Sequence, residues 1–153
     1  MSDVIIIGAG PAGLYAAYYA GFRGFSVTVV DALPEAGGQI SAMYPEKDIF
    51  DVAGFPAVKG RDLVDGLMTQ AAAFSPTFVL GERVEQLTSS TDGPVTVVTD
   101  AGTRIEAKAA IITGGIGSFT PRELPTGSEF AGRGLVYFVP RLDEHAGKDV
   151  VIV

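Results

Sequence analysis

The sequence predicts an α/β fold of three layers, in which a parallel sheet lies between helices and a small antiparallel meander. A strand–helix–strand pattern occupies about the first thirty residues, and a cluster of short strand-like runs follows Pro76. The chain of 153 residues is 47% apolar and 19% charged, which is typical of a folded domain with one core. These three observations together predict the fold class.

The predicted parallel sheet begins close to the N-terminus. Residues 3–7 (DVIII) are an uninterrupted apolar run that ends at a glycine, as expected for a strand buried on both faces. Residues 11–22 are rich in Ala and aromatic residues and are long enough for a helix, with Pro11 suited to its first turn. Residues 26–30 (SVTVV) supply the second parallel strand, which completes the strand–helix–strand unit.

After the second predicted strand the sequence predicts a long loop, then a helix, and then a series of short strands. Residues 32–58 have neither helical nor strand periodicity, so we expect a long loop, which in a compact domain is usually functional. Residues 61–74 carry apolar side chains at helical spacing, which predicts an amphipathic helix. The runs after it predict a parallel strand at 77–80, an antiparallel meander over 83–107, a buried strand at 109–113, and further strands at 135–139 and 149–153.

A glycine-rich turn follows the first predicted strand and has the GxGxxG spacing of Gly8, Ala9, Gly10, Pro11, Ala12 and Gly13. Gly8 permits the tight turn, Gly10 lets the backbone approach a pyrophosphate, and Gly13 lets the helix pack closely on the strand. Asp31 ends the second strand, where a carboxylate would bind ribose hydroxyls. The combination predicts an FAD/NAD(P)-binding (Rossmann-like) domain without distinguishing the two cofactors. The alternative is that the glycines serve only a tight turn and Asp31 only a solvated strand end.

Composition narrows the possible chemistry. The chain has no cysteine and a single histidine, which excludes disulfides, a dithiol relay and a multi-histidine metal site within it. A net charge of −7 argues against nucleic acid and anionic membranes as partners. The apolar run at the N-terminus is too short for a signal peptide or a membrane span, so a cytoplasmic location is expected.

Residues 37–56 (GGQISAMYPEKDIFDVAGFP) and the segment 107–124 carry a sharper similarity. Together with the fingerprint, they resemble the thioredoxin-reductase-like (bacterial type 2) ferredoxin–NADP reductases, and the resemblance covers essentially the whole chain. Thioredoxin reductases carry a redox-active CxxC pair after a GRG-x-x-Tyr segment. This chain has Phe138 and Arg141 at those positions, so reduction of thioredoxin by that route is excluded.

The resemblance implies an FAD site. It implies that the Tyr44 ring lies against the isoalloxazine and that Gln39 hydrogen-bonds near the ribityl chain or the flavin edge. The further residues that it assigns to the cofactor are Asp51, Val84, Thr113, Gly115 and Phe119. The alternatives are a tyrosine half-buried in its own loop for Tyr44, an acidic helix-entry residue for Asp51, core packing for Phe119, and an ordinary glycine-rich turn around Gly115.

The resemblance also implies an activity, in which electrons pass from NADPH through FAD to ferredoxin or flavodoxin without a redox disulfide. On this interpretation residues 1–134 are the N-terminal lobe of the FAD-binding domain, and residues 135–153 are a connector and the first strand of a truncated NADPH-binding domain. The chain alone is then expected to be inactive, with weak or absent binding of FAD, and the full-length protein is expected to be a homodimer. The alternatives are a related flavin oxidoreductase with a ferric or quinone acceptor, and a non-catalytic nucleotide-binding module.

Overall fold

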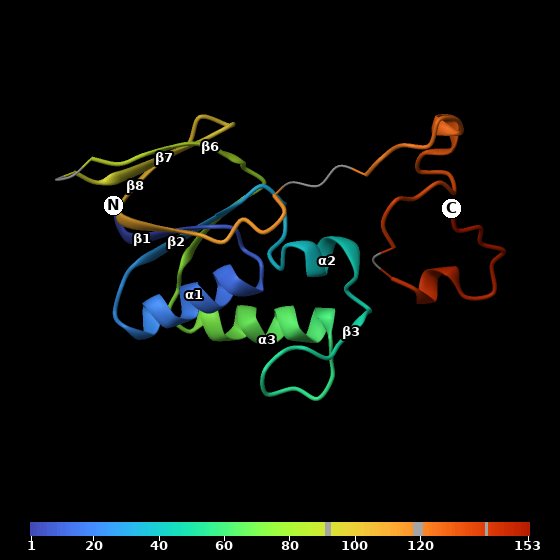
Figure 1. The fold of residues 1–153 in the computed structure, drawn as a ribbon, viewed down its shortest axis with the longest axis horizontal. Helices are drawn as coiled ribbons and strands as arrows, with labels where there is room; N and C mark the ends of the chain where they lie inside the picture. The colour runs from blue at the N-terminus through green and yellow to red at the C-terminus, as the bar shows by residue number, and fades with distance from the viewer. Residues whose placement is uncertain (91–92, 118–120, 140) are drawn as a thin grey trace.

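The computed structural model describes residues 1–90, 93–117, 121–139 and 141–153. Three layers are visible in Figure 1: helices α1 and α3 lie on one side of the parallel strands, and strands β6 and β7 with the beginning of β8 form a layer on the other side. This arrangement confirms the predicted fold class.

The helices of the described chain are α1 (Pro11–Phe22), α2 (Gln39–Met43) and α3 (Gly60–Ala72), with single 3-10 turns at η1 (Ser128–Phe130) and η2 (Asp143–His145). The strands are β1 (Ser2–Ile7), β2 (Val27–Asp31), β3 (Asp48–Ile49), β4 (Val58–Lys59), β5 (Thr77–Leu80), β6 (Val84–Thr88), β7 (Val95–Thr99) and β8 (Arg104–Ile112). The helix predicted at 11–22 and the strand predicted at 77–80 have the same bounds in the structure.

The main sheet has the strand order β5-β2-β1-β8-β7-β6. The first four strands are parallel, and β8 pairs with β7, and β7 with β6, in antiparallel fashion. Parallel strands end at the same edge, so the segments after β1, β2, β5 and β8 converge there. This edge is where the fingerprint turn and Asp31 lie.

Strand β8 joins two predicted elements into one. We expected the meander to stop at 107 and a separate buried strand to follow at 109–113. Instead, residues 104–107 of β8 pair with β7, and residues 107–112 pair with β1. The expected burial was also wrong, because Ile111 is 40% and Ile112 71% exposed.

Two apolar clusters hold the layers together, one on each face of the parallel strands. On the helix side Ile6 and Val29 pack with Ala17 and Ala20 of α1 and Ala71 of α3. On the meander side Ile5 and Val30 pack with Val97 of β7 and Ala107 of β8. Alternate residues of β1 and β2 therefore point to opposite faces, and both faces are covered, as the continuous apolar runs predicted.

Three further expectations were wrong. Residues 32–58 are not entirely loop, because the short helix α2 and the two-residue strands β3 and β4 lie within them. Residues 135–139 and 149–153 do not form strands; they are irregular apart from an isolated bridge between Leu135 and Ala131. Neither segment is paired in the main sheet, and an extended apolar segment needs a partner edge to become a strand.

Among the described residues, no helix is both long enough and apolar enough to cross a membrane.

Candidate functional site: a cleft at the carboxyl edge of the sheet

A cleft with a volume of about 600 Å³ lies over the fingerprint turn, and its lining is mainly apolar. It is bounded by the ends of β1 and β2, by helix α2, by the start of β6 and by the segment after β8. Ten of the predicted site residues line it: Gly8, Gly10, Pro11, Ala12, Asp31, Gln39, Tyr44, Val84, Thr113 and Gly115. The structure thus brings most of the predicted site together.

The floor of the cleft depends on two glycines of the fingerprint. Gly8 has φ +108°, and a Cβ built there would lie 2.4 Å from the carbonyl oxygen of Thr113. A Cβ on Gly13 would lie 1.8 Å from the carbonyl oxygen of Gly8. A side chain on Gly8 would therefore displace the segment after β8, and one on Gly13 would displace the start of α1, so both glycines are needed for this close packing.

Thr113, which follows β8, is hydrogen-bonded to the same turn. Its hydroxyl lies 3.1 Å from the carbonyl oxygen of Ile7 and 2.9 Å from that of Gly8, so it can donate to either. Its backbone N–H also donates to Ile7 O at 2.7 Å. The first fingerprint glycine is thus held between β1 and the end of β8.

Asp31 is fixed at the opposite wall by backbone donors. Its Oδ2 accepts the N–H of Ala9 at 2.6 Å, and its Oδ1 accepts the N–H of Leu33 at 2.8 Å. The carboxylate therefore couples the fingerprint turn to the end of β2 while remaining part of the cleft lining. Each oxygen keeps a second lone pair that can accept a hydroxyl donor from a ligand.

Gln39 and Tyr44 lie at the two ends of α2 and contact each other. The Tyr44 hydroxyl donates to Gln39 Oε1 at 3.4 Å, and both side chains are partly buried. With its oxygen engaged in this way, the Gln39 amide has its NH₂ group available for another acceptor. On the Tyr44 ring itself, the Lys47 ammonium lies 5.5 Å from the centroid, within cation–π range.

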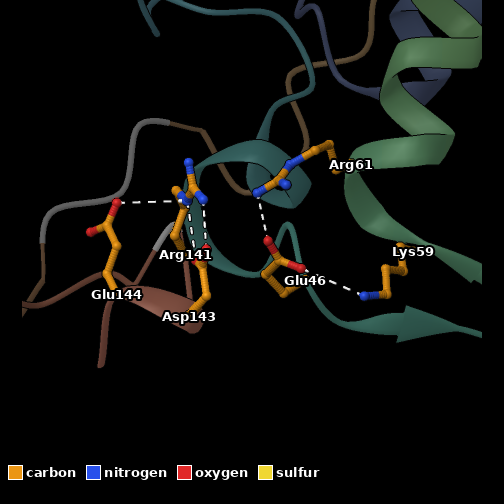
Figure 2. Close-up of polar contacts among 6 residues, drawn as sticks. All are labelled: Glu46, Lys59, Arg61, Arg141, Asp143 and Glu144. Atoms are coloured by element: carbon orange, nitrogen blue, oxygen red, sulfur yellow. Dashed lines mark hydrogen bonds and ion pairs between the residues drawn. The ribbon is translucent and has the colours of Figure 1, made fainter. Parts of the chain in front are cut away.

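The turn that carries Tyr44 is joined to the start of α3. The N–H of Arg61 donates to the carbonyl oxygen of Pro45 at 2.8 Å, and the N–H of Gly60 donates to that of Lys47 at 3.0 Å. Figure 2 shows Glu46 between two cations: its carboxylate lies 2.6 Å from the Arg61 guanidinium and 3.7 Å from the Lys59 ammonium. Residues 44–47 are therefore attached to the helix by backbone and side-chain contacts together.

Four predicted site residues do not line the cleft. Ala9 is buried beneath it and contributes its N–H to Asp31, and Gly13 is the packing contact described above. Asp51 lies exposed in the segment between β3 and β4, so the structure does not bring it to the cleft. Phe119 lies outside the described residues.

Several residues that line the cleft were not predicted as site residues from the sequence, among them Leu33, Met43, Glu82, Arg83, Ile116 and Phe138. Glu82 and Arg83 reach it because the connection from β5 to β6 folds back over the end of β2, where the Glu82 N–H donates to Asp31 O at 3.1 Å. The Glu82 carboxylate also accepts the Thr99 hydroxyl at 2.6 Å. Their only signal in the sequence was their proximity to Val84.

The cleft is suited to binding more than to acid–base chemistry. It combines the N-terminus of α1, which no side chain caps, with a largely apolar lining. The uncapped N–H groups of a helix favour an anion. Among the described residues, no group of three or more His, Cys, Asp or Glu could hold a metal ion. The arrangement is that of a site for a large ligand with phosphate groups and an apolar ring system.

Known proteins resemble this chain over different extents. The family described as NAD(P)-binding Rossmann-like domain matches residues 6–55. The ferredoxin–NADP reductase of Frankia casuarinae is 59% identical over 98% of this chain and 46% of its own length. That of a Nocardioides species is 60% identical over 99% of this chain and 47% of its own length. The chain therefore spans about half the length of the curated relatives it matches.

Structural comparison agrees with the sequence comparison. A crystal structure of thioredoxin reductase from Streptococcus pyogenes is 29% identical with a TM-score of 0.66, covering 88% of this chain and 41% of that one. The resemblance seen in the sequence is thereby confirmed. Over almost its whole length the chain is therefore similar to ferredoxin–NADP reductases, and its fold is similar to the corresponding part of a thioredoxin reductase.

Proposed function

We propose that this chain forms the FAD-binding part of a flavoprotein reductase that passes electrons from NADPH through FAD to ferredoxin or flavodoxin. The observation that carries the proposal is the cleft itself, in which an uncapped helix N-terminus and a mainly apolar lining meet at the fingerprint turn. The relatives are named ferredoxin–NADP reductases, which supports this activity for a protein that contains this chain.

The pyrophosphate end of the proposed site lies beside the point where Gly10 and Gly38 approach each other. A Cβ on Gly38 would come 3.0 Å from the Cα of Gly10, so two backbone segments approach each other here without side chains between them. An anion at this point can reach free N–H groups at the start of α1 and gains from the helix dipole. Both glycines line the cleft, so a pyrophosphate could lie along their backbones without meeting a side chain, which supports the fit of a dinucleotide.

The proposed nucleoside end lies along the ends of β2 and β6. Asp31, held by two backbone N–H groups, would accept the ribose hydroxyls. Its negative charge disfavours a 2′-phosphate at that ribose, which supports FAD over NADP at this site. Val84 would lie near the adenine through its backbone, as the family resemblance implies.

The proposed flavin end lies at α2. Tyr44 would cover one face of the isoalloxazine and exclude water, and Gln39 would donate its amide N–H to the cofactor. Thr113 and Gly115 would follow the cofactor from the other side of the cleft. The flavin supplies the change from two-electron to one-electron transfer, and the absence of cysteine from the chain excludes a dithiol step within it.

We further assign residues 1–134 to the FAD-binding lobe, and residues 135–153 to a connector and the beginning of an NADPH-binding domain. The complete enzyme would be a homodimer. Because the hydride donor's site is assigned outside these residues, the chain by itself should bind FAD weakly and reduce nothing from NADPH.

Titration of the purified chain with FAD, followed by the quenching of FAD fluorescence, tests the proposal. We expect weak, saturable binding that Gly10→Val weakens by at least about tenfold, a loss of ~1.4 kcal/mol, because the new side chain lies where the pyrophosphate passes. Gly66→Ala, on the open face of α3, is the control and should bind as the parent chain does. Binding that is indifferent to Gly10→Val would contradict the site, and NADPH-dependent dye reduction by the chain alone would contradict the domain assignment.

A further inference from the structure

The Tyr44 ring has different neighbours on its two sides. Tyr44 lines the cleft, whereas Lys47 does not and is exposed to solvent. The Lys47 ammonium nevertheless lies 5.5 Å from the centroid of the ring. Because Lys47 does not line the cleft, we infer that its ammonium covers the face of the ring turned away from the cleft, which leaves the other face to a ligand.

The backbone geometry keeps Lys47 close to the ring. The N–H of Lys47 donates to the carbonyl oxygen of Tyr44 at 3.1 Å, which closes a tight turn over residues 44–47. That turn is attached to α3 through Gly60 and through the Glu46–Arg61 pair, as Figure 2 shows for the side chains. Because both residues belong to one fixed turn, no further backbone freedom is lost when the ammonium rests over the ring, and only the lysine side chain has to be ordered.

The charge of Lys47 is also available to the ring. Within the described parts of the chain, no carboxylate lies within ion-pair distance of its ammonium, whereas Lys59 on the same side pairs with Glu46 at 3.7 Å. At the far end of the ring the Tyr44 hydroxyl donates to Gln39 Oε1. The ring is thus held at its hydroxyl by Gln39 and at its outer face by a cation.

We propose that Lys47 is a positioning and tuning residue for the flavin end of the cleft. It acts through the Tyr44 ring, which it holds against the ligand and to whose outer face it presents a positive charge. This proposal rests on the proposed FAD site. A cation behind the stacking ring favours an electron-rich ligand, so it should stabilise reduced flavin more than oxidised flavin.

The expected effects are small and directional. Lys47→Gln should weaken FAD binding by at most about two- to fivefold, because the whole energy of an exposed cation–π contact is the upper limit for a contact that also exists in the free chain. It should also move the reduction potential of bound FAD to a more negative value. Lys47→Arg keeps a cation over the ring, so FAD affinity and the reduction potential should stay close to those of the parent chain. Lys59→Gln also removes one positive charge, but from the ion pair with Glu46, and should change neither quantity.

The decisive experiment is a double-mutant cycle with Lys47→Gln and Tyr44→Leu. FAD affinity is measured by fluorescence quenching, and the reduction potential of FAD at saturating protein by equilibration with a reference dye. If Lys47 acts through the ring, Lys47→Gln has no further effect in the Tyr44→Leu background. Equal effects in both backgrounds, or an equal effect of Lys59→Gln, would overturn the proposal.

A second measurement needs no cofactor. In proton NMR of the chain without FAD, the CεH₂ protons of Lys47 should be shifted upfield by the ring current of Tyr44, and the shift should disappear in Tyr44→Leu. A normal Lys47 shift in the parent chain would overturn the contact itself. If the upfield shift is present but no variant binds FAD at all, the proposed function fails, and with it the tuning role, while the contact stands.

Discussion

Residues 1–117 bury many of their apolar side chains, whereas the described residues of 121–153 leave theirs exposed or half-buried. In the described structure the first region contains every α-helix, every strand and all of the buried residues. The described residues of the second region form two single 3-10 turns, and none of them is buried. Ile6 is fully buried, whereas Ile152, in an equally apolar run, is 93% exposed.

The difference shows what converts an apolar run into a strand. Residues 77–80 (TFVL) and residues 149–153 (DVVIV) have similar compositions, but only the former lie beside the open edge of β2. A strand forms where its backbone groups find a partner and its side chains find a layer to pack on. In the second region of this chain neither is present for the described residues.

The largest expected effect comes from making one substitution in both regions. Ile6→Ala removes a fully buried side chain between β1 and α1, and should lower the free energy of unfolding by about 2–5 kcal/mol. Ile152→Ala should change it by less than about 0.5 kcal/mol. Urea denaturation followed by far-UV circular dichroism measures both, and comparable losses at the two sites would break the contrast.

A smaller effect is expected from adding one methyl group at two helical glycines. Gly13→Ala places a Cβ 1.8 Å from the carbonyl oxygen of Gly8, and should destabilise the fold by about 1–3 kcal/mol as α1 is displaced. Gly66→Ala meets nothing within 4 Å and should stabilise α3 by about 0.5–1 kcal/mol. Melting temperatures that fall in both variants would show that the close contact at Gly13 is not the cause.

Removal of the second region should have a smaller effect still. A chain that ends after Gly117 keeps both apolar clusters and the whole main sheet, so its free energy of unfolding should change by less than about 1 kcal/mol. The shortened chain lacks Phe138, which lines the cleft, so the free energy of FAD binding should change more than the free energy of unfolding. Loss of cooperative unfolding in the shortened chain would contradict this independence.

The smallest effect concerns one exposed carboxylate. The Lys108 ammonium, 2.6 Å away, and then the Ser26 hydroxyl and N–H hold the pKa of Asp3 well below its usual range. A carboxyl whose pKa is lowered by folding stabilises the fold fully above its unfolded pKa of about 3.9, and this contribution is lost as the pH falls toward the folded pKa.

Asp3→Asn should therefore lower the melting temperature slightly at pH 7, and the difference from the parent chain should shrink as the pH falls below about 4. Thermal unfolding between pH 7 and pH 3 measures the difference. Lys108→Gln, which removes the principal partner of Asp3, should show the same pH dependence. A difference that is constant with pH would contradict the linkage.

Most of the fold could be predicted because its signals are local and uninterrupted. The helix at 11–22 has a glycine turn before it and no charged residue within it, and the strand at 77–80 lies between a helix and a glycine. The continuity of β8 could not be predicted, because its two halves have different partners: β7 pairs with the first and β1 with the second. A polar residue, Lys108, also interrupts its apolar pattern at the point of change.

The candidate site likewise contains residues that could be predicted from the sequence and residues that could not. The glycines and Asp31 follow from sequence spacing, because their contribution is the backbone turn and the end of a strand. Helix α2 was missed since it is five residues long, has no buried residue and begins after Gly38 at φ +60°. Glu82 and Arg83 were missed because only the tertiary folding of the β5–β6 connection brings them to the cleft.

The pairing of β1 with β8 has a consequence for the order in which the molecule is assembled. Ser2 pairs with Ala107 and Ile7 with Ile112, so this edge of β1 stays open after its synthesis until about a hundred further residues have been made. Contacts of such long range form slowly, and an open apolar edge can pair with the wrong neighbour in the meantime. The fingerprint turn is translated early, but the nucleotide cleft is completed only when Thr113 arrives.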